Sequence, residues 1–160
     1  MKEKQNRILN ALNKISDVSN IQTDTNDISD EKVLSIGDFD IDSMHYSFFY
    51  SEGHPLIIGE LTVAFTYEKV KFTENLHLYQ ALNNFNKKSI AIKASILQID
   101  KKNKELTVEF SYGFLEDMEF SKEKDLDLQP AVSILAMVPE KLSAELKNKK
   151  IVHDYLVGSH

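Results

Sequence analysis

The chain of 160 residues contains no cysteine and no tryptophan, and only five glycines and three prolines. Without cysteine there are no disulfides, no thiolate metal sites and no cysteine nucleophile. The few glycines form neither GxGxxG nor GxxxxGK[ST], so no phosphate-cradling loop is encoded, and a GxSxG nucleophile turn is also missing. We therefore expect a protein that is not an enzyme and that binds no cofactor.

Metal-ligating patterns are also missing. The five histidines form neither an HxH nor an HExxH pair, and no thiolate could complete a zinc site. The histidines are His45, His54, His77, His153 and His160. We expect structural or surface roles for them and no histidine metal centre.

No apolar run approaches the roughly 20 residues of a membrane span, and the N-terminus lacks an apolar core of signal-peptide length. We expect a cytoplasmic protein. The formal charge of -6 opposes binding to nucleic acid or to an anionic membrane, because both recruit clustered Lys and Arg. The charge suits a protein that engages a basic or apolar polypeptide.

What the sequence does contain is ordinary for a globular protein, with 42% hydrophobic and 28% charged residues. A chain of this length is most simply a single domain, here residues 1–160. Ile8, Leu12 and Ile15 recur with the helical period and predict a first helix. Residues 16–32 are rich in Ser, Thr, Asn and Asp and predict a long polar loop that joins this helix loosely to the rest.

Strands follow this loop. A weak strand is predicted near 33–41, and alternation at Tyr46, Phe48 and Tyr50 predicts a clearer one. Residues 51–55 predict a hairpin turn. The clearest period of two comes next, at Leu61, Val63, Phe65 and Tyr67, and predicts an antiparallel sheet with one face in a core.

The second half predicts a helix, a hairpin and a last helix. Thr73 is the predicted N-cap of a helix that ends near Asn86, and Ile90 then begins a strand over 89–99. The apolar phase shifts at Ile96–Leu97, which predicts a bulge. A polar turn at 100–105, a strand over 105–114 and an acidic connection at 115–127 complete the hairpin.

Pro130 suits the first turn of the last helix, whereas Pro139 either kinks that helix or divides it. The tail 151–160 carries no assignable pattern. The predicted fold class is therefore α+β, an antiparallel sheet of about five strands with helices packed on it, in the order α-β-β-β-α-β-β-α.

Residues 73–146 resemble the YbjN family of sensory transduction regulators, which shares its fold with the class I chaperones of type III secretion. The resemblance rests on Leu82, Asn83, Phe85 and Asn86, followed by a basic pair, a hairpin, an acidic loop and an apolar helix. The loop 100–104 lacks the glycine often found there in YbjN-like proteins. The resemblance implies a chaperone-like, dimeric protein that binds another polypeptide, and it implies no catalytic residue.

Asp38, Asp40 and Asp42 alternate in the segment GDFDIDS. In a strand they would share one face, close enough to hold a cation. An EF-hand loop is excluded because Ser43 and Phe49 occupy its glycine and glutamate positions. The other interpretation is a charged edge strand that discourages sheet-to-sheet aggregation, with Phe39 and Ile41 turned inward.

Three apolar residues fall out of phase with their strands, namely Phe49, Leu97 and Ile99. Either a helix covers them or they form a hydrophobic surface for a partner or for a homodimer. Two binding classes follow from these observations. One is a chaperone-like or regulatory module, and the alternative is an immunity-type inhibitor that blocks a basic toxin through surface carboxylates, including those of loop 115–127. A small enzyme is the third and disfavoured class.

Overall fold

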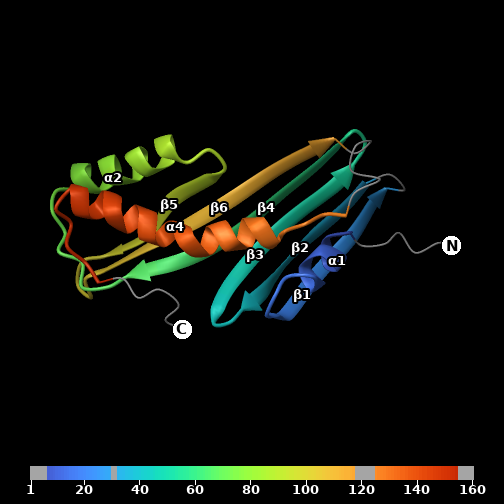
Figure 1. Ribbon diagram of the computed structural model, residues 1–160, viewed down its shortest axis with the longest axis horizontal. Helices are drawn as coiled ribbons and strands as arrows, with labels where there is room; N and C mark the ends of the chain where they lie inside the picture. The colour runs from blue at the N-terminus through green and yellow to red at the C-terminus, as the bar shows by residue number, and fades with distance from the viewer. Residues whose placement is uncertain (1–6, 30–31, 118–124, 155–160) are drawn as a thin grey trace. The chain divides into compact units, whose positions relative to one another are not determined.

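The computed structural model describes residues 7–29, 32–117 and 125–154. It is an α+β structure with a six-stranded antiparallel sheet and, among the described residues, three helices (Figure 1). Its elements are α1 (Arg7–Asn13), β1 (Val18–Ser29), β2 (Lys32–Ile41), β3 (Met44–Gly53), β4 (Leu56–Tyr67), α2 (Asn75–Lys88), β5 (Ile92–Asp100), β6 (Glu105–Asp117) and α4 (Gln129–Asn148). The strand order is β1-β2-β3-β4-β6-β5. The predicted fold class is confirmed in its general form, whereas the predicted strand count and order differ.

The contacts within the chain divide it into two compact units. Among the described residues, unit 1 comprises 7–61 and 113–132, and unit 2 comprises 62–112 and 133–154. The single domain expected from chain length stays a prediction.

Unit 1 is built on the antiparallel ladders of β1, β2 and β3 with the short helix α1. In the β2–β3 register Phe39 lies opposite Tyr46, and their rings stack with centroids 5.2 Å apart. Tyr46, Phe48 and Tyr50 are all buried, as their alternation predicts. Ile8 and Leu12 of α1 are buried as well, so the apolar side of this helix contributes to the core.

The predicted polar loop at 16–32 is wrong, because Val18–Ser29 forms strand β1. β1 pairs with β2 along its length, with irregularities at Ser19/Gln22 and Asp27/Ser29. Ile15 is buried, and the Val18 amide donates to its carbonyl, so the first helix is not loosely joined. A strand held by backbone ladder bonds at the edge of a sheet needs little apolar alternation, which is why the segment read as a loop.

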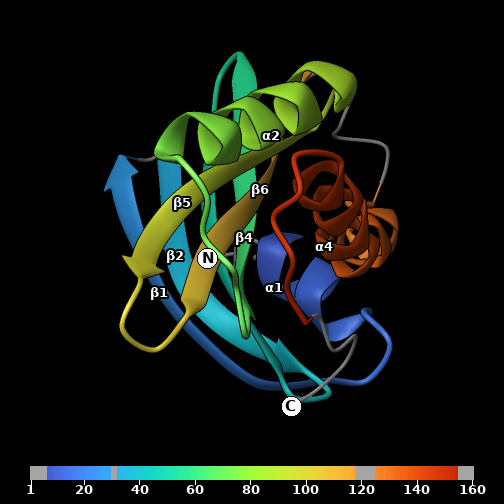
Figure 2. The same cartoon turned by 90° about the vertical axis from the view of Figure 1, so that its left-hand side faces the viewer.

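Unit 2 contains the joint between α2 and β5. Leu78, Leu82 and Phe85 are buried, and the Phe85 ring meets the Phe110 ring of β6 edge-on at 5.7 Å. α2 lies along β5 (Figure 2). The helix thus packs on the sheet as expected, but Ile90 does not continue the strand, since it precedes β5 and is 98% exposed.

Two further details of unit 2 concern the predicted joint. The N-cap residue of α2 is Glu74 instead of Thr73, and it makes no side-chain cap hydrogen bond. The predicted bulge is confirmed as a register shift between Ile96 and Gln98.

Helix α4 begins at Gln129, so Pro130 lies in its first turn as predicted, and Pro139 does not divide the helix. In unit 2 the Tyr67 hydroxyl donates to the Pro139 carbonyl at 2.6 Å. The predicted acidic connection is shorter than 115–127 because β6 continues to Asp117, and residues 118–124 lie outside the described residues.

The tail is structured up to Asp154. Ile151 and His153 are buried, and Asp154 forms an antiparallel bridge with Glu68. Residues 151–154, to which the sequence assigned no structure, are therefore packed and paired, and 155–160 lie outside the described residues. None of the described helices has the length and apolar character needed to cross a membrane.

Candidate functional site

Exposed apolar side chains lie on the strands of unit 1. Ile36 of β2 lies directly opposite Phe49 of β3, and paired residues of an antiparallel ladder point to the same face. Ile36 is 47% exposed and Phe49 is 41% exposed. The adjacent pair of the ladder is formed by Ser35 and Tyr50, which are both buried and point to the other face. The two exposed side chains therefore belong to the outward face of the sheet.

The same face continues onto β4 and β6. Ile57 is buried whereas its neighbours Leu56 and Ile58 are exposed, so the neighbours point outward. The Phe114 ring lies against the buried Gly59, so Leu115, next to Phe114, points outward and is also exposed. We call this surface the open face, which consists of Ile36, Phe49, Leu56, Ile58 and Leu115. Contiguous exposed apolar side chains of this kind mark interaction sites.

Carboxylates border the open face. Asp38 and Asp40 occupy the same side of β2 as Ile36, whereas Asp42 follows the end of the strand with a φ of 54°. The Asn20 side-chain amide donates to Asp40 at 2.8 Å, and His45 Nδ1 lies 2.7 Å from the same carboxylate. The hydrogen bond from Asn20, followed by that from His45, lowers the pKa of Asp40. Asp40 is thereby kept ionised beside the apolar residues.

The three aspartates do not form a cation site in this structure. In residues 7–29, 32–117 and 125–154, no group of three His, Cys, Asp or Glu side chains is placed to hold a metal ion. The edge interpretation needs a correction as well, because β2 lies between β1 and β3 and is not an edge strand. Phe39 is fully buried as predicted, whereas Ile41 is half-buried.

The other two predicted partner residues, Leu97 and Ile99, belong to unit 2, whereas Phe49 belongs to unit 1. Leu97 sits in the bulge of β5 and is 55% exposed. Ile99 pairs with the fully buried Leu106 and so points toward the core. The structure thus does not place Leu97 and Ile99 on one face.

Four of the five residues of the open face were not predicted from the sequence, namely Ile36, Leu56, Ile58 and Leu115. Leu56, Ile57 and Ile58 read as one apolar run, and only the burial of Ile57 shows that the outer two point away from the core. Ile36 lies in the segment predicted as a weak strand. The sequence signal that could have found them is the occurrence of apolar residues at outward as well as inward positions of neighbouring strands.

A shallow, open hollow lies beside the irregularity of β1. Its lining residues are Gln22, Thr23, Asp24, Ile36, Gly37, Asp38 and Phe48. The lining offers two carboxylates and no histidine, lysine or arginine, so it supplies no acid and base of different pKa. The hollow suits contact with a side chain of a partner better than it suits chemistry.

The two edge strands of the sheet, β5 and β1, differ in how far their backbone is open to pairing with another strand. At β5, the Asn86 side chain accepts from the Ala94 amide at 2.8 Å and donates to the Ala94 carbonyl at 3.0 Å. Together with the bulge at Ile96–Gln98, this interrupts the edge as a template for another strand. β1 is the opposite edge, and it lies beside the open face.

One buried pair has the composition of a catalytic dyad. The Ser143 hydroxyl lies 2.6 Å from His153 Nε2, and His153 Nδ1 lies 2.8 Å from the Ile151 carbonyl. Since a carbonyl only accepts, Nδ1 carries the proton and Ser143 donates to Nε2. Both residues are buried, at 4% and 7% exposure, so a substrate has no access to the hydroxyl. The pair fastens residues 151–154 to α4.

Comparisons with protein-family models, with curated proteins and with solved structures gave no match to the chain. The resemblance to YbjN-like proteins therefore stays a prediction.

Proposed function

We propose that the chain is a non-enzymatic protein-binding module, chaperone-like or regulatory, that receives another polypeptide on the open face of unit 1. The observation that carries the proposal is the exposed cross-strand pair Ile36 and Phe49. Burying two large apolar side chains contributes about 1.5–3 kcal/mol each to association. The homodimer implied by the resemblance and the cytoplasmic location expected from the sequence belong to the same proposal.

The charge around the open face supports a basic partner. Asp38 and Asp40 follow Ile36 on the same side of β2, and Asp24 lies opposite Ile36 on β1. Clustered carboxylates speed the encounter with a basic segment and disfavour acidic ones. An extended or amphipathic segment that alternates apolar with Lys or Arg side chains fits such a surface.

The same carboxylates favour one alternative, an immunity-type inhibitor that blocks the basic site of a toxin. The two functions differ in the balance of apolar and ionic contact. Raising the salt from about 0.05 M to about 0.5 M screens exposed charges and leaves apolar contact nearly unchanged. Both complexes should form more slowly, but a chaperone-like complex held by apolar contact should keep most of its affinity, whereas an inhibitor complex held by ion pairs should lose affinity steeply.

The decisive experiment compares matched variants in affinity capture from the native host. Ile36→Ser/Phe49→Ser removes the apolar pair, and Ile134→Ser/Met137→Ser removes two apolar side chains of α4 that are at least comparably exposed. A polypeptide recovered by the wild type and by the α4 variant, but lost from the Ile36/Phe49 variant, supports the proposal. Equal recovery by all three chains rejects the open face as the binding surface.

A further inference from the structure

The two units carry net charges of opposite sign, negative in unit 1 and positive in unit 2. Among the described residues of unit 1, three Lys and Arg stand against twelve Asp and Glu, a formal charge of -9. In unit 2, twelve lysines stand against eight Asp and Glu, a formal charge of +4. In the part of the chain that the structure describes, the excess of acidic residues therefore lies in unit 1.

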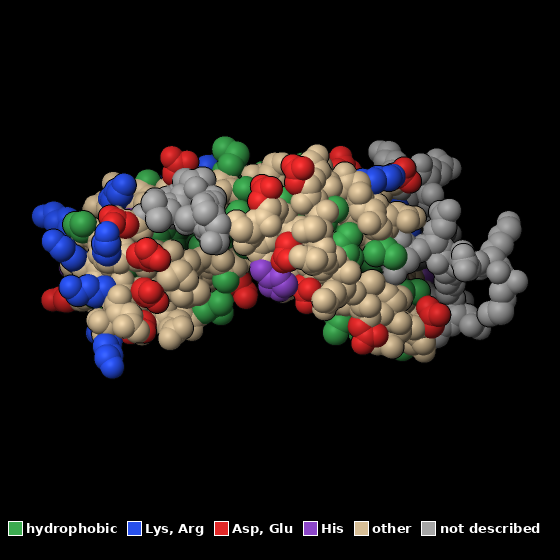
Figure 3. Space-filling view, turned by 90° about the horizontal axis from the view of Figure 1, so that it is seen from below, with side chains coloured by type: hydrophobic (Ala, Val, Ile, Leu, Met, Phe, Trp, Pro, Cys, Tyr) green, Lys and Arg blue, Asp and Glu red, His purple; other side chains and the backbone are tan. Residues whose placement is uncertain are grey.

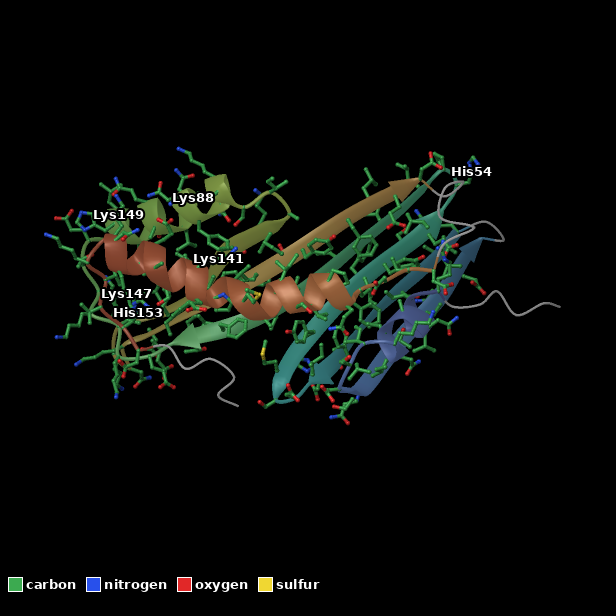
Figure 4. All side chains as sticks on the ribbon, in the orientation of Figure 1. His54, Lys88, Lys141, Lys147, Lys149 and His153 are labelled. Atoms are coloured by element: carbon green, nitrogen blue, oxygen red, sulfur yellow. The ribbon has the colours of Figure 1, made fainter. Side chains whose placement is uncertain are left out.

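Lysines gather at one end of unit 2, which we call the lysine end (Figure 3). They are Lys69, Lys71, Lys101, Lys102, Lys104, Lys147, Lys149 and Lys150. Backbone hydrogen bonds bring their three segments together. The Val70 amide donates to the Lys104 carbonyl at 2.9 Å, and the Lys71 amide donates to the Val152 carbonyl at 2.8 Å, directly after α4. Figure 4 shows Lys147 of α4 beside His153 and Lys149 just after the end of the same helix.

A structural role accounts for only part of this cluster. Lysines near a helix C-terminus interact favourably with the helix dipole, which explains Lys147 and its neighbours. The lysines of the β4 end and of the β5–β6 turn have no such helix end. Within the part of the chain that the structure describes, Lys69 pairs with Asp154 at 3.0 Å, and no other lysine of this end lies within ion-pair distance of a carboxylate.

We propose that the lysine end docks on unit 1 of a second copy of this chain. Each copy then offers a basic unit to the acidic unit of the other, and the two equivalent contacts close the assembly as a two-fold dimer. This inference specifies the contact of the homodimer included in the proposed function, and it uses the lysine end, so loss of partner binding at the open face would leave it standing.

Charge complementarity favours a second copy over a nucleic acid. The acidic unit of the same molecule repels a phosphate polymer, whereas a second copy supplies that unit at equal concentration. Arginine and exposed aromatic side chains, which bind nucleic-acid bases, are missing from the described residues of the lysine end. The exposed Val152 adds an apolar contact next to the lysines.

The first test measures the oligomeric state of matched charge variants. Lys101→Glu/Lys102→Glu reverses two exposed lysines of the β5–β6 turn, and Lys87→Glu/Lys141→Glu reverses two exposed lysines outside the lysine end. By sedimentation at low salt, the turn variant should raise the dimer dissociation constant on the order of tenfold, and the control should change it less than about twofold. Lys147→Glu/Lys149→Glu provides a second variant should the turn variant fail to fold.

The second test identifies the partner surface. A zero-length carbodiimide reagent joins Lys to Asp or Glu in a mixture of isotope-labelled and unlabelled chains. Cross-links between copies should run from Lys101 or Lys102 to carboxylates of unit 1. The inference is overturned by a monomer at about 100 micromolar and low salt, by cross-links confined to one copy, or by an unchanged dimer in both lysine-end variants. A monomer whose lysine end binds a labelled oligonucleotide would also overturn it.

Discussion

The Phe114 ring of β6 packs directly against Gly59 of β4 in unit 1. A Cβ added to Gly59 would lie 2.0 Å from the Phe114 ring, a distance that no real pair of carbon atoms occupies without movement. Gly59 is buried, and the ring fills the volume that a side chain would otherwise take. The Phe114 ring thus packs on the inner side of β4, and the neighbouring residues Ile58 and Leu115 belong to the open face.

Gly59→Ala should therefore destabilise the protein, by about 1–3 kcal/mol, because the ring must leave its position. The matched control is Gly113→Ala on β6, where the nearest atom to an added Cβ is the Gly59 carbonyl oxygen at 3.9 Å. The control should stay within about 0.5 kcal/mol of the wild type. Chemical denaturation measures both. Equal stability of the two variants would contradict the packing described, and Phe114→Leu should recover part of the loss in Gly59→Ala.

Asn86 is expected to protect the β5 edge. Asn86→Ala removes both hydrogen bonds to Ala94 and should cost about 1–3 kcal/mol, because the edge amide and carbonyl are part-buried. Asn86→Asp keeps the acceptor and loses the donor, so it should fall between. Asn83→Ala, at an exposed position of the same helix, is the control and should be nearly neutral.

Hydrogen exchange provides the local measurement for Asn86. The Ala94 amide should lose protection in Asn86→Ala and keep it in Asn83→Ala. Unchanged protection of Ala94 in Asn86→Ala would mean that the side-chain amide does not satisfy the edge.

The sequence predicted those elements whose burial follows their own period. Tyr46, Phe48 and Tyr50 alternate because one face of β3 meets the core, and Leu78, Leu82 and Phe85 recur because one side of α2 does. The bulge of β5 was predictable because it shifts that period. In each case the amino-acid pattern and the local structure have the same cause.

Other features depended on tertiary contacts that leave no such pattern. β1 is a polar strand that is held by its ladder to β2 and by the contact between the Thr25 and Ser35 hydroxyls. Whether Ile36 and Phe49 are covered depends on where helices pack, which no local pattern encodes. Residues 151–154 are too few to show a period, although specific bonds from Ser143 and Lys71 hold them.

His153 makes the packing of residues 151–154 dependent on pH. Burial, as the largest cause, lowers the pKa of His153, the hydrogen bond to the Ile151 carbonyl raises it, and Lys147 lowers it further, while Asp154 acts in the opposite direction. The Tyr67 ring meets the imidazole edge-on at 5.3 Å. Protonation of Nε2 would remove the acceptor that the Ser143 hydroxyl uses.

The sign of the effect follows from the lowered pKa. Below the ordinary histidine pKa of 6.5 the unfolded chain binds a proton that the folded chain resists, so the free energy of unfolding falls as the pH decreases. This loss continues until the pH passes the lowered pKa of the folded state. His153→Gln, which does not titrate, should lack this part of the decline between about pH 7 and about pH 5. Unfolding curves at several pH values measure it, and the same decline in both proteins would refute the role of His153.

The last prediction concerns Lys88 of α2 and Glu145 of α4, which form an ion pair within unit 2. The Glu145 side chain is only 11% exposed, whereas that of Lys88 is 69% exposed. Lys88→Ala leaves a mostly buried carboxylate without this ammonium and should cost about 1 kcal/mol, a value reduced by the exposure of the lysine. Lys87→Ala, at the neighbouring exposed position, should change stability by less than about 0.5 kcal/mol.

A double-mutant cycle separates the ion pair from lost helix packing. If the pair is the cause, Glu145→Leu added to Lys88→Ala should recover most of the loss, because no unpaired charge then remains in the interior. Additive losses in the double variant, measured by chemical denaturation, would show instead that Lys88 stabilises α2 through its aliphatic stem.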